Sequence, residues 1–222
     1  MSNVDNESFV DFFVPPNFEP GGEMKLLDAI LTGKWLGCMH YWAIRQNCGR
    51  YELLFQRRPA DSYNMPGLLD SSAAGYYFAG EWHQKKYFRE VEEELGFSPD
   101  PKTTFLLDRR PVSIINEKTG RERKIIVDVF VGVVQMELHD FVLDDAEVKG
   151  ICWVPIDELI ELFNGKHSSL EVNVISGSGV VASETINSND FKHQYDSYYE
   201  RVPLLINLWL NKSLRLPSVD SL

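Results

Sequence analysis

The amino-acid sequence predicts an α/β fold, a mixed β-sheet with helices on its two faces in an α/β/α sandwich. Strand-like runs and helical segments follow one another along the chain, and both carry the apolar patterns that such layers bury. The 222 residues are 44% hydrophobic and 25% charged, close to the average for globular proteins. A chain of this length can bury a real core, so we expect one domain with additions.

The first 36 residues are predicted to form an extension that packs on the main domain. Proline and glycine, the strongest local breakers of regular structure, punctuate this segment. Residues 23–32 predict a short helix that ends at Gly33. The punctuating residues are Pro15, Pro16, Pro20, Gly21 and Gly22.

The central part of the chain is predicted to contain strands around one helix. Two β-prone runs, residues 38–45 and 51–57, flank Gln46-Asn47-Cys48-Gly49, which is typical of a hairpin turn. A helix is expected over residues 82–95, where Gly96 provides a left-handed cap. Further strands are expected over residues 70–79, 103–116, 122–137 and 148–154.

The C-terminal part is predicted to be less regular. Pro155 suits the first position of a helix that runs through Phe163. Residues 165–190 are rich in Ser, Gly and Asn and predict an irregular insertion. A last helix is expected over about 190–212, with Pro203 kinking or breaking it. We therefore place the main domain at 37–164, with residues 165–222 completing it.

Composition excludes several classes of function. The formal net charge of −11 argues against a nucleic-acid polymer as partner, because such binding needs basic surface. No run reaches the ~18–20 apolar residues of a membrane span, and the N-terminus lacks the features of a secretory signal. The three cysteines, Cys38, Cys48 and Cys152, do not predict a disulfide framework or a zinc site. We expect a cytoplasmic protein without a membrane partner.

The predicted helix at 82–95 carries a cluster of carboxylates. At about 100° per residue, Glu90, Glu93 and Glu94 fall on one face. The opposite face is apolar and can pack on a sheet. Unpaired carboxylates at this spacing repel one another, and Mg²⁺, which prefers oxygen ligands, would relieve that repulsion. The apolar face consists of Phe88, Val91 and Leu95.

The spacing upstream of this cluster completes a longer pattern. Gly75 is followed by five residues and Glu81, and then by seven residues and the run REVEEELGF at 89–97. This resembles a complete Nudix box, Gly-x5-Glu-x7-Arg-Glu-U-x-Glu-Glu-x-Gly-U, in which U is a bulky apolar residue. Residues 147–159 also resemble the strand and helix that close many Nudix domains. The resemblance covers roughly residues 37–164.

The resemblance implies a Nudix-type fold and a metal-dependent reaction. In this family the box forms a loop–helix–loop that binds a divalent metal and a diphosphate. The implied substrate is a small-molecule diphosphate, a nucleoside diphosphate derivative or another group X joined to a diphosphate. The implied reaction is hydrolysis by attack of water at phosphorus with Mg²⁺, or with Mn²⁺ as the second candidate. Homodimers are common in the family, so a homodimer is the oligomeric state to test.

The resemblance also implies roles for individual box residues. Glu90, Glu93 and Glu94 are the expected metal ligands, and Glu90 is alternatively the group that deprotonates the attacking water. Arg89 is expected to hold a glutamate carboxylate through its planar fork. The catalytic candidates are therefore Glu90, Glu93 and Arg89. Structural roles fall to Gly75, Glu81 and Gly96, and the carbonyl of Ala74 or Gly75 is a further candidate ligand.

Residues outside the box are candidates for two further roles. Arg57 and Arg58 end a strand near the box and are the expected substrate-binding cations. An additional carboxylate often acts from a loop outside the box in this family. The candidates for that carboxylate are Asp144, Asp145 and Glu147.

Two alternatives remain open at this point. Residues 63–76 and His40 are similar to a segment of Nudix proteins related to type I isopentenyl-diphosphate isomerase, which moves a proton across a carbon–carbon double bond. The isomerase uses a cysteine and a histidine where this chain has Ala74 and Tyr76, which favours hydrolysis. The third reading is a non-catalytic Nudix domain used for binding or regulation, although such domains often lack a box glutamate.

Overall fold

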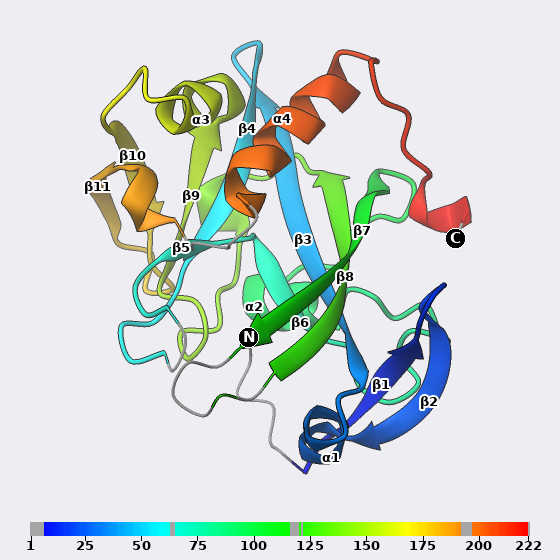
Figure 1. Cartoon of the computed structure of the whole chain (residues 1–222). Helices are drawn as coiled ribbons and strands as arrows, with labels where there is room; N and C mark the ends of the chain where they lie inside the picture. Colours follow the sequence, from blue (N-terminus) through cyan, green and yellow to red (C-terminus); the bar gives the residue numbers. More distant parts are fainter. Residues whose placement is uncertain (1–6, 63–64, 116–119, 121, 192–196, 222) are drawn as a thin grey trace.

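The computed structural model describes residues 7–62, 65–115, 120, 122–191 and 197–221. Within them, eleven strands form one mixed sheet with helices on both faces (Figure 1). The main path of the sheet runs β11-β10-β9-β4-β3-β1-β2, and β5, β6, β7 and β8 join it from the side. The predicted α/β fold class is confirmed.

The N-terminal extension is built mainly from a β-hairpin. β1 (Phe9–Val14) pairs antiparallel with β2 (Glu19–Lys25), and β1 then joins β3 at residues 12 and 13. The helix predicted over residues 23–32 is shorter in the structure, where α1 spans Leu26–Leu31. The extension therefore adds strands to the sheet, which the proline and glycine content of this segment did not indicate.

The central hairpin follows the prediction closely. β3 (Trp35–Asn47) and β4 (Arg50–Arg57) pair antiparallel, with Asn47 opposite Arg50. Cys48 and Gly49 connect them with φ of 48° and 81°, the left-handed conformation of a two-residue hairpin turn. On its other edge β3 runs parallel to β8 (Glu122–Val133), so this long strand joins most of the sheet.

The remaining strands surround this hairpin. The strand predicted over residues 70–79 is two short strands, β5 (Leu69–Asp70) and β6 (Ala73–Tyr76), and β6 pairs with β3. β7 (Thr104–Ile115) pairs antiparallel with β8, and β9 (Gly150–Pro155) pairs with β4. The last residues of the strand predicted over 122–137 lie outside β8.

The helix of the box is shorter than predicted. α2 spans Arg89–Leu95 and ends at Gly96, whose φ of 74° confirms the left-handed cap. Residues 77–88, predicted in part as helix, form a turn-rich loop in which Gly80 and Lys85 have positive φ. Because Tyr87 and Phe88 are buried against Phe130, aromatic packing fixes this loop in place of a helix.

The C-terminal third differs from the prediction at two places. After α3 (Ile156–Phe163), residues 165–190 contain a hairpin of β10 (Leu170–Ile175) and β11 (Val181–Ile186), so the predicted irregular insertion is wrong. α4 (Tyr198–Leu210) runs through Pro203, so the helix does not break at this proline. Single turns of 3-10 helix occur at Leu138–Asp140, Ser188–Asp190 and Val219–Ser221.

The sheet separates two apolar cores. One face packs against α1, α3 and α4, with Leu159 and Ile206 in its core. The other face packs against α2 through Val91 and Leu95. Figure 1 shows α3 and α4 in front of the sheet and α2 behind it. The acidic helix is therefore clamped to the sheet by its apolar side, and its polar side faces the start of β6.

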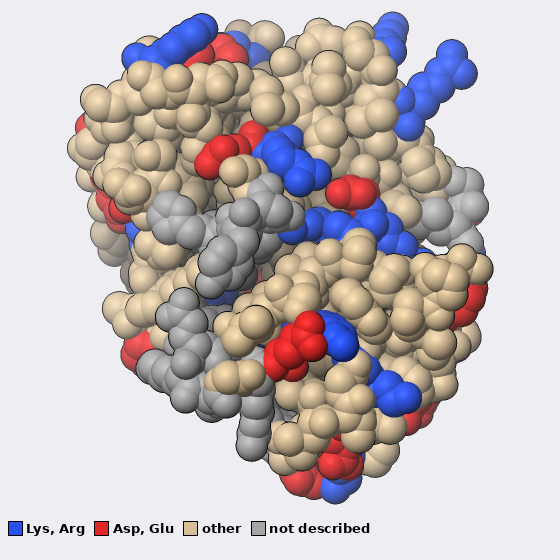
Figure 2. Space-filling view, viewed as in Figure 1, with Lys and Arg blue, Asp and Glu red and all other residues tan. Residues whose placement is uncertain are grey.

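Two further observations concern the charge of the surface and the length of the helices. On the face drawn in Figure 2, Lys and Arg side chains lie beside Asp and Glu side chains in several places and do not form one basic field. No helix among the described residues is long and apolar enough to cross a membrane.

Candidate metal and active site

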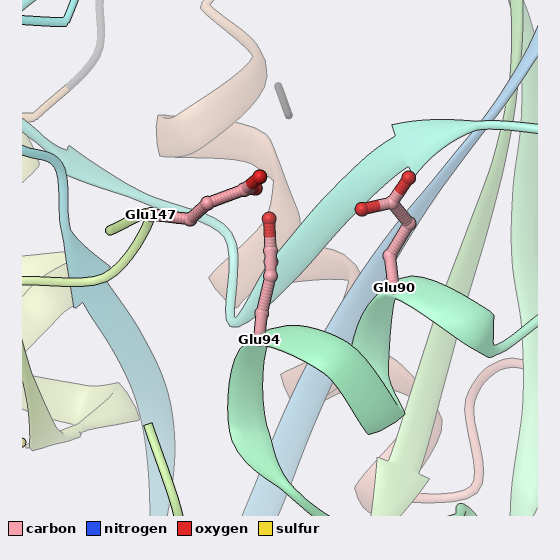
Figure 3. A group of neighbouring side chains, drawn as sticks. All are labelled: Glu90, Glu94 and Glu147. Atoms are coloured by element: carbon pink, nitrogen blue, oxygen red, sulfur yellow. The ribbon is translucent and has the colours of Figure 1, made fainter. Parts of the chain in front are cut away.

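Three carboxylates converge at the polar side of α2. Glu90 and Glu94 project from this helix, and Glu147 reaches them from the loop that precedes β9 (Figure 3). One carboxylate oxygen of each residue lies within 4.8 Å of those of the other two. Glu90 and Glu94 are buried, whereas Glu147 is partly exposed. Sequence reasoning found two of these residues in the box and had Glu147 among three loop candidates.

The electrostatics of the cluster fit a divalent cation. Burial raises the pKa of Glu90 to about 7, against the opposing effect of the Arg89 charge. Burial also raises the pKa of Glu94 well above its ordinary value, and the neighbouring Glu90 and Glu147 add to this effect. The pKa of Glu147 is raised by burial as well. A bound cation with oxygen preference would supply the positive charge that keeps three such carboxylates ionised.

Glu94 is oriented by two donors that meet one of its oxygens. The side-chain amide of Gln56, on β4, donates to Glu94 Oε2 over 3.2 Å, and the backbone N–H of Ala74 donates to the same oxygen over 3.2 Å. Such contacts fix the direction of a ligand carboxylate. Gln56 is buried and was not identified from the sequence, because a lone glutamine in a strand gives no signal of its contact with a distant helix.

Gly75 provides the space for Glu90. A Cβ added to Gly75 would overlap Cγ, Cδ and Oε1 of the Glu90 side chain. Gly75 therefore allows β6 to approach the Glu90 carboxylate closely, because it has no side chain. Gly96, at the other end of the box, needs both its positive φ and the space beside Val142.

Arg89 connects the carboxylates of the box. Its Nε donates to Glu81 Oε1 over 2.7 Å, its Nη2 to Glu90 Oε1 over 2.7 Å, and its Nη1 to Glu93 Oε2 over 2.5 Å. Nη2 also donates to the Tyr76 carbonyl over 3.0 Å. The guanidinium carbon lies 3.9 Å from the centre of the Phe78 ring. A planar fork is needed for this set of contacts.

Glu93 does not join the carboxylate cluster in this structure. Its side chain is 54% exposed and pairs with Arg89 one turn earlier on the helix. Glu90 and Glu94 lie one turn apart and so share a face, whereas Glu93 is displaced around the helix. The metal-binding role expected for Glu93 stays a prediction.

The expected substrate cations are already engaged by carboxylates. Arg57 donates to Glu184 Oε2 over 2.5 Å and to the Gly67 carbonyl over 2.8 Å. Arg58 is buried and donates to Asp70 Oδ2 over 3.0 Å. These contacts give both arginines a place in the fold, and their expected role toward substrate stays a prediction.

The positions that relate to the isomerase carry a different network. His40 lies in the middle of β3, and its Nδ1 is 3.0 Å from the Tyr198 hydroxyl. The Tyr76 hydroxyl accepts a hydrogen bond from Arg123 over 3.0 Å. Ala74 offers no side-chain proton donor. This network lies against α4, on the face of the sheet opposite α2.

Comparison with protein families matches residues 40–172 to the NUDIX domain. This match spans more than half of the chain and includes the whole box. The chain therefore belongs to the Nudix family and is a Nudix hydrolase. The N-terminal hairpin, α1 and α4 lie outside the matched residues.

Individual relatives agree with this assignment. An uncharacterized Nudix hydrolase of Clostridium acetobutylicum is 27% identical over 174 residues, covering 75% of this chain and 82% of that protein. Nudix hydrolase 3 of Arabidopsis thaliana is 30% identical over 132 residues, covering 57% of this chain and 16% of that protein. Among solved structures, a MutT/nudix family protein from Enterococcus faecalis has a TM-score of 0.50 at 12% identity, covering 80% of this chain and 63% of that one, which shows a shared fold.

Proposed function

We propose that this chain is a Mg²⁺-dependent hydrolase that cleaves a diphosphate linkage in a nucleoside diphosphate derivative or another X-linked diphosphate. The observation that carries the proposal is the convergence of Glu90, Glu94 and Glu147 within 4.8 Å. Mn²⁺ is expected to replace Mg²⁺, because both suit carboxylate ligands. The cytoplasmic location and the homodimer stay predictions.

The three carboxylates would hold the metal, and the bound ion would clamp phosphoryl oxygens and lower the pKa of a water molecule. The protein contributes orientation. Gln56 and the Ala74 N–H fix one oxygen of Glu94, and Arg89 fixes one oxygen of Glu90. Carboxylates held in this way spend no free energy on reorganisation when the charged transition state forms.

Glu147 is the carboxylate best placed to accept a proton from water. Its side chain is partly exposed on a loop, whereas Glu90 and Glu94 are buried and are held by hydrogen bonds within the protein. A proton acceptor must meet both the attacking water and solvent to return the proton. We therefore assign this role to the Glu147 carboxylate oxygen that would not hold the metal, and keep Glu90 as the alternative that the box suggests.

The test compares two glutamates of the same helix. Phosphate release is measured with and without Mg²⁺ across nucleoside diphosphate derivatives, dinucleoside polyphosphates and isoprenoid diphosphates, with pyrophosphatase and phosphatase as coupling enzymes. Glu94→Gln should lower kcat/KM at least 100-fold. Glu92→Gln, on the exposed side of α2, should leave it within twofold.

Three results would contradict the proposal. Full activity of Glu94→Gln would remove the carboxylate site from the reaction. Isomerisation of an isoprenoid diphosphate by the unchanged protein would favour the isomerase. No phosphate release from any substrate of the panel, by a protein that binds Mg²⁺, would favour a binding role.

A further inference from the structure

An aspartate of the N-terminal hairpin holds the loop that leads into α2. Asp11 lies on β1, outside the residues that match the family, and is 3% exposed. Its Oδ1 accepts the backbone N–H of Gly80 over 2.8 Å, and its Oδ2 accepts that of Trp82 over 3.1 Å. Both oxygens of one carboxylate are thus bound to amides on either side of Glu81.

The side chain of Glu81 connects this loop with Arg89. Glu81 Oε2 accepts the backbone N–H of Phe78 over 2.8 Å, and Glu81 Oε1 accepts Arg89 Nε over 2.7 Å. Arg89 then donates to Glu90 in the carboxylate cluster over 2.7 Å. Asp11 on β1 is therefore connected with Glu90 on α2 in two stages: its hydrogen bonds hold the backbone beside Glu81, and the side chains of Glu81 and Arg89 continue the contact to Glu90.

A second aspartate anchors the same loop independently. Asp128 of β8 accepts the Trp82 indole N–H and the Tyr77 hydroxyl, each over 3.1 Å. Trp82 also packs edge-to-face against Phe13 of β1. These contacts do not involve Asp11, so the loop has a means to stay packed when the Asp11 carboxylate is removed. Asp11 provides the acceptors for the two backbone N–H groups on either side of Glu81.

We propose that Asp11 is a positioning residue for the metal site, acting through Glu81 and Arg89. Hydrogen bonds from amides to a buried carboxylate are charge-assisted and strong, and they set the place from which Glu81 reaches Arg89. Loss of a group that hydrogen-bonds to a metal ligand typically changes metal affinity or activity by 10- to 100-fold, and Arg89 is such a group for Glu90. The N-terminal hairpin is therefore part of the catalytic scaffold. This inference rests on the metal site of the proposed function, and its kinetic measurements rest in addition on the proposed hydrolysis.

The experiment uses the full chain and three variants. Asp11→Ala removes both acceptors, and Asp11→Asn keeps one acceptor and directs an NH₂ group at the other amide. Leu26→Ala is the control, because Leu26 is buried in the same extension but belongs to α1 and not to the loop contacts. The measurements are hydrogen exchange of residues 77–89, the Kd for Mn²⁺, kcat and KM, and the melting temperature.

Asp11→Ala should raise exchange in residues 77–89 at least tenfold, weaken Mn²⁺ binding about tenfold, and lower kcat with little change in KM. Asp11→Asn should shift the same quantities in the same direction by less. Leu26→Ala should lower the melting temperature while exchange in 77–89 and the Kd for Mn²⁺ stay within twofold of the wild type.

Two results would overturn the inference. One is a folded Asp11→Ala protein whose Kd for Mn²⁺ stays within twofold of the wild type, or, where only Asp11→Asn folds, an Asp11→Asn protein with unchanged Kd and unchanged exchange in residues 77–89. The other is the same loss of Mn²⁺ affinity in Leu26→Ala, which would indicate general destabilisation. A wild-type protein that binds Mn²⁺ but hydrolyses nothing would contradict the proposed function, and the exchange and Mn²⁺ measurements would still decide the role of Asp11.

Discussion

Replacing Glu90 with Gln should stabilise the protein in the absence of metal, and it should abolish the metal-dependent activity. Glu90 is buried, and its pKa is raised from 4.5 to about 7. At about 1.4 kcal/mol per pH unit, this difference corresponds to roughly 3 kcal/mol of unfolding free energy that the ionised side chain removes. Gln keeps an oxygen for the hydrogen bond from Arg89 but loses the ionic attraction. We therefore expect a net gain of about 1–3 kcal/mol at pH 8.

The gain should depend on pH in a defined direction. Well below pH 4.5 the Glu90 carboxyl is protonated in both folded and unfolded chains, so its ionisation makes no difference to stability. Between pH 4.5 and about 7 the folded chain keeps the proton that the unfolded chain releases, and the unfolding free energy falls as pH rises. Above about pH 7 the full loss is present. The advantage of Glu90→Gln should thus grow from pH 5 to pH 8.

The assay is thermal unfolding of both proteins in EDTA and in excess Mg²⁺. In EDTA at pH 8 the variant should melt higher by about 2–4 °C for each kcal/mol gained. In Mg²⁺ the order should reverse, because only the wild type gains binding free energy from a complete carboxylate site. A variant that is less stable than the wild type in EDTA at pH 8, or a difference independent of pH, would refute this reasoning.

Three further substitutions have defined outcomes. Gly75→Ala should lower kcat/KM more than 100-fold in steady-state kinetics, because the new Cβ would overlap the Glu90 side chain; near-wild-type kinetics would show that the carboxylate moves freely. Arg89→Lys should lower kcat/KM about 10- to 100-fold, since an ammonium cannot reproduce the contacts of the planar fork; unchanged kinetics would show that charge alone suffices. Tyr199→Phe should lower the unfolding free energy in urea by about 1–3 kcal/mol, because the buried hydroxyl donates to Asp70; an unchanged unfolding free energy would contradict this contribution.

The sequence predicted those parts of the fold that depend on local patterns. The hairpin turn at Cys48-Gly49 and the left-handed cap at Gly96 follow from backbone conformations that the local residues favour. The β10–β11 hairpin was missed although Leu170, Val172 and Val174 alternate with polar residues in β10. The Ser, Gly and Asn content of the surrounding segment obscured this period of two, which predicts a strand.

The candidate site could be predicted where its residues lie close together in the sequence. The spacing from Gly75 to Gly96 identified Glu90 and Glu94, because both the space and the ligands lie within one loop–helix segment. Gln56 and Asp11 were not predictable, since their contacts with the box depend on how distant strands pack. The same limit applies to the loop before α2, where aromatic packing overrides helical propensity.

The sequence limited the additional carboxylate outside the box to three candidates but did not distinguish among them. The three candidates all precede β9, and each has a carboxylate that suits the role. They are Asp144, Asp145 and Glu147. In the structure Glu147 joins the cluster, whereas Asp144 accepts the backbone N–H of Ala146 within its own loop. Side-chain direction in a loop is set by the fold, so only the structure distinguishes the three.

The central claim is that carboxylates from the box and from the loop before β9 form one metal site. An Mn²⁺ titration of the wild type, Glu94→Gln, Glu147→Gln and Glu92→Gln, followed by electron paramagnetic resonance, tests it most directly. We predict one site in the wild type and in Glu92→Gln, and an affinity at least tenfold weaker in both Glu94→Gln and Glu147→Gln. Wild-type affinity in Glu147→Gln would contradict the account, because that residue joins the site only through the fold.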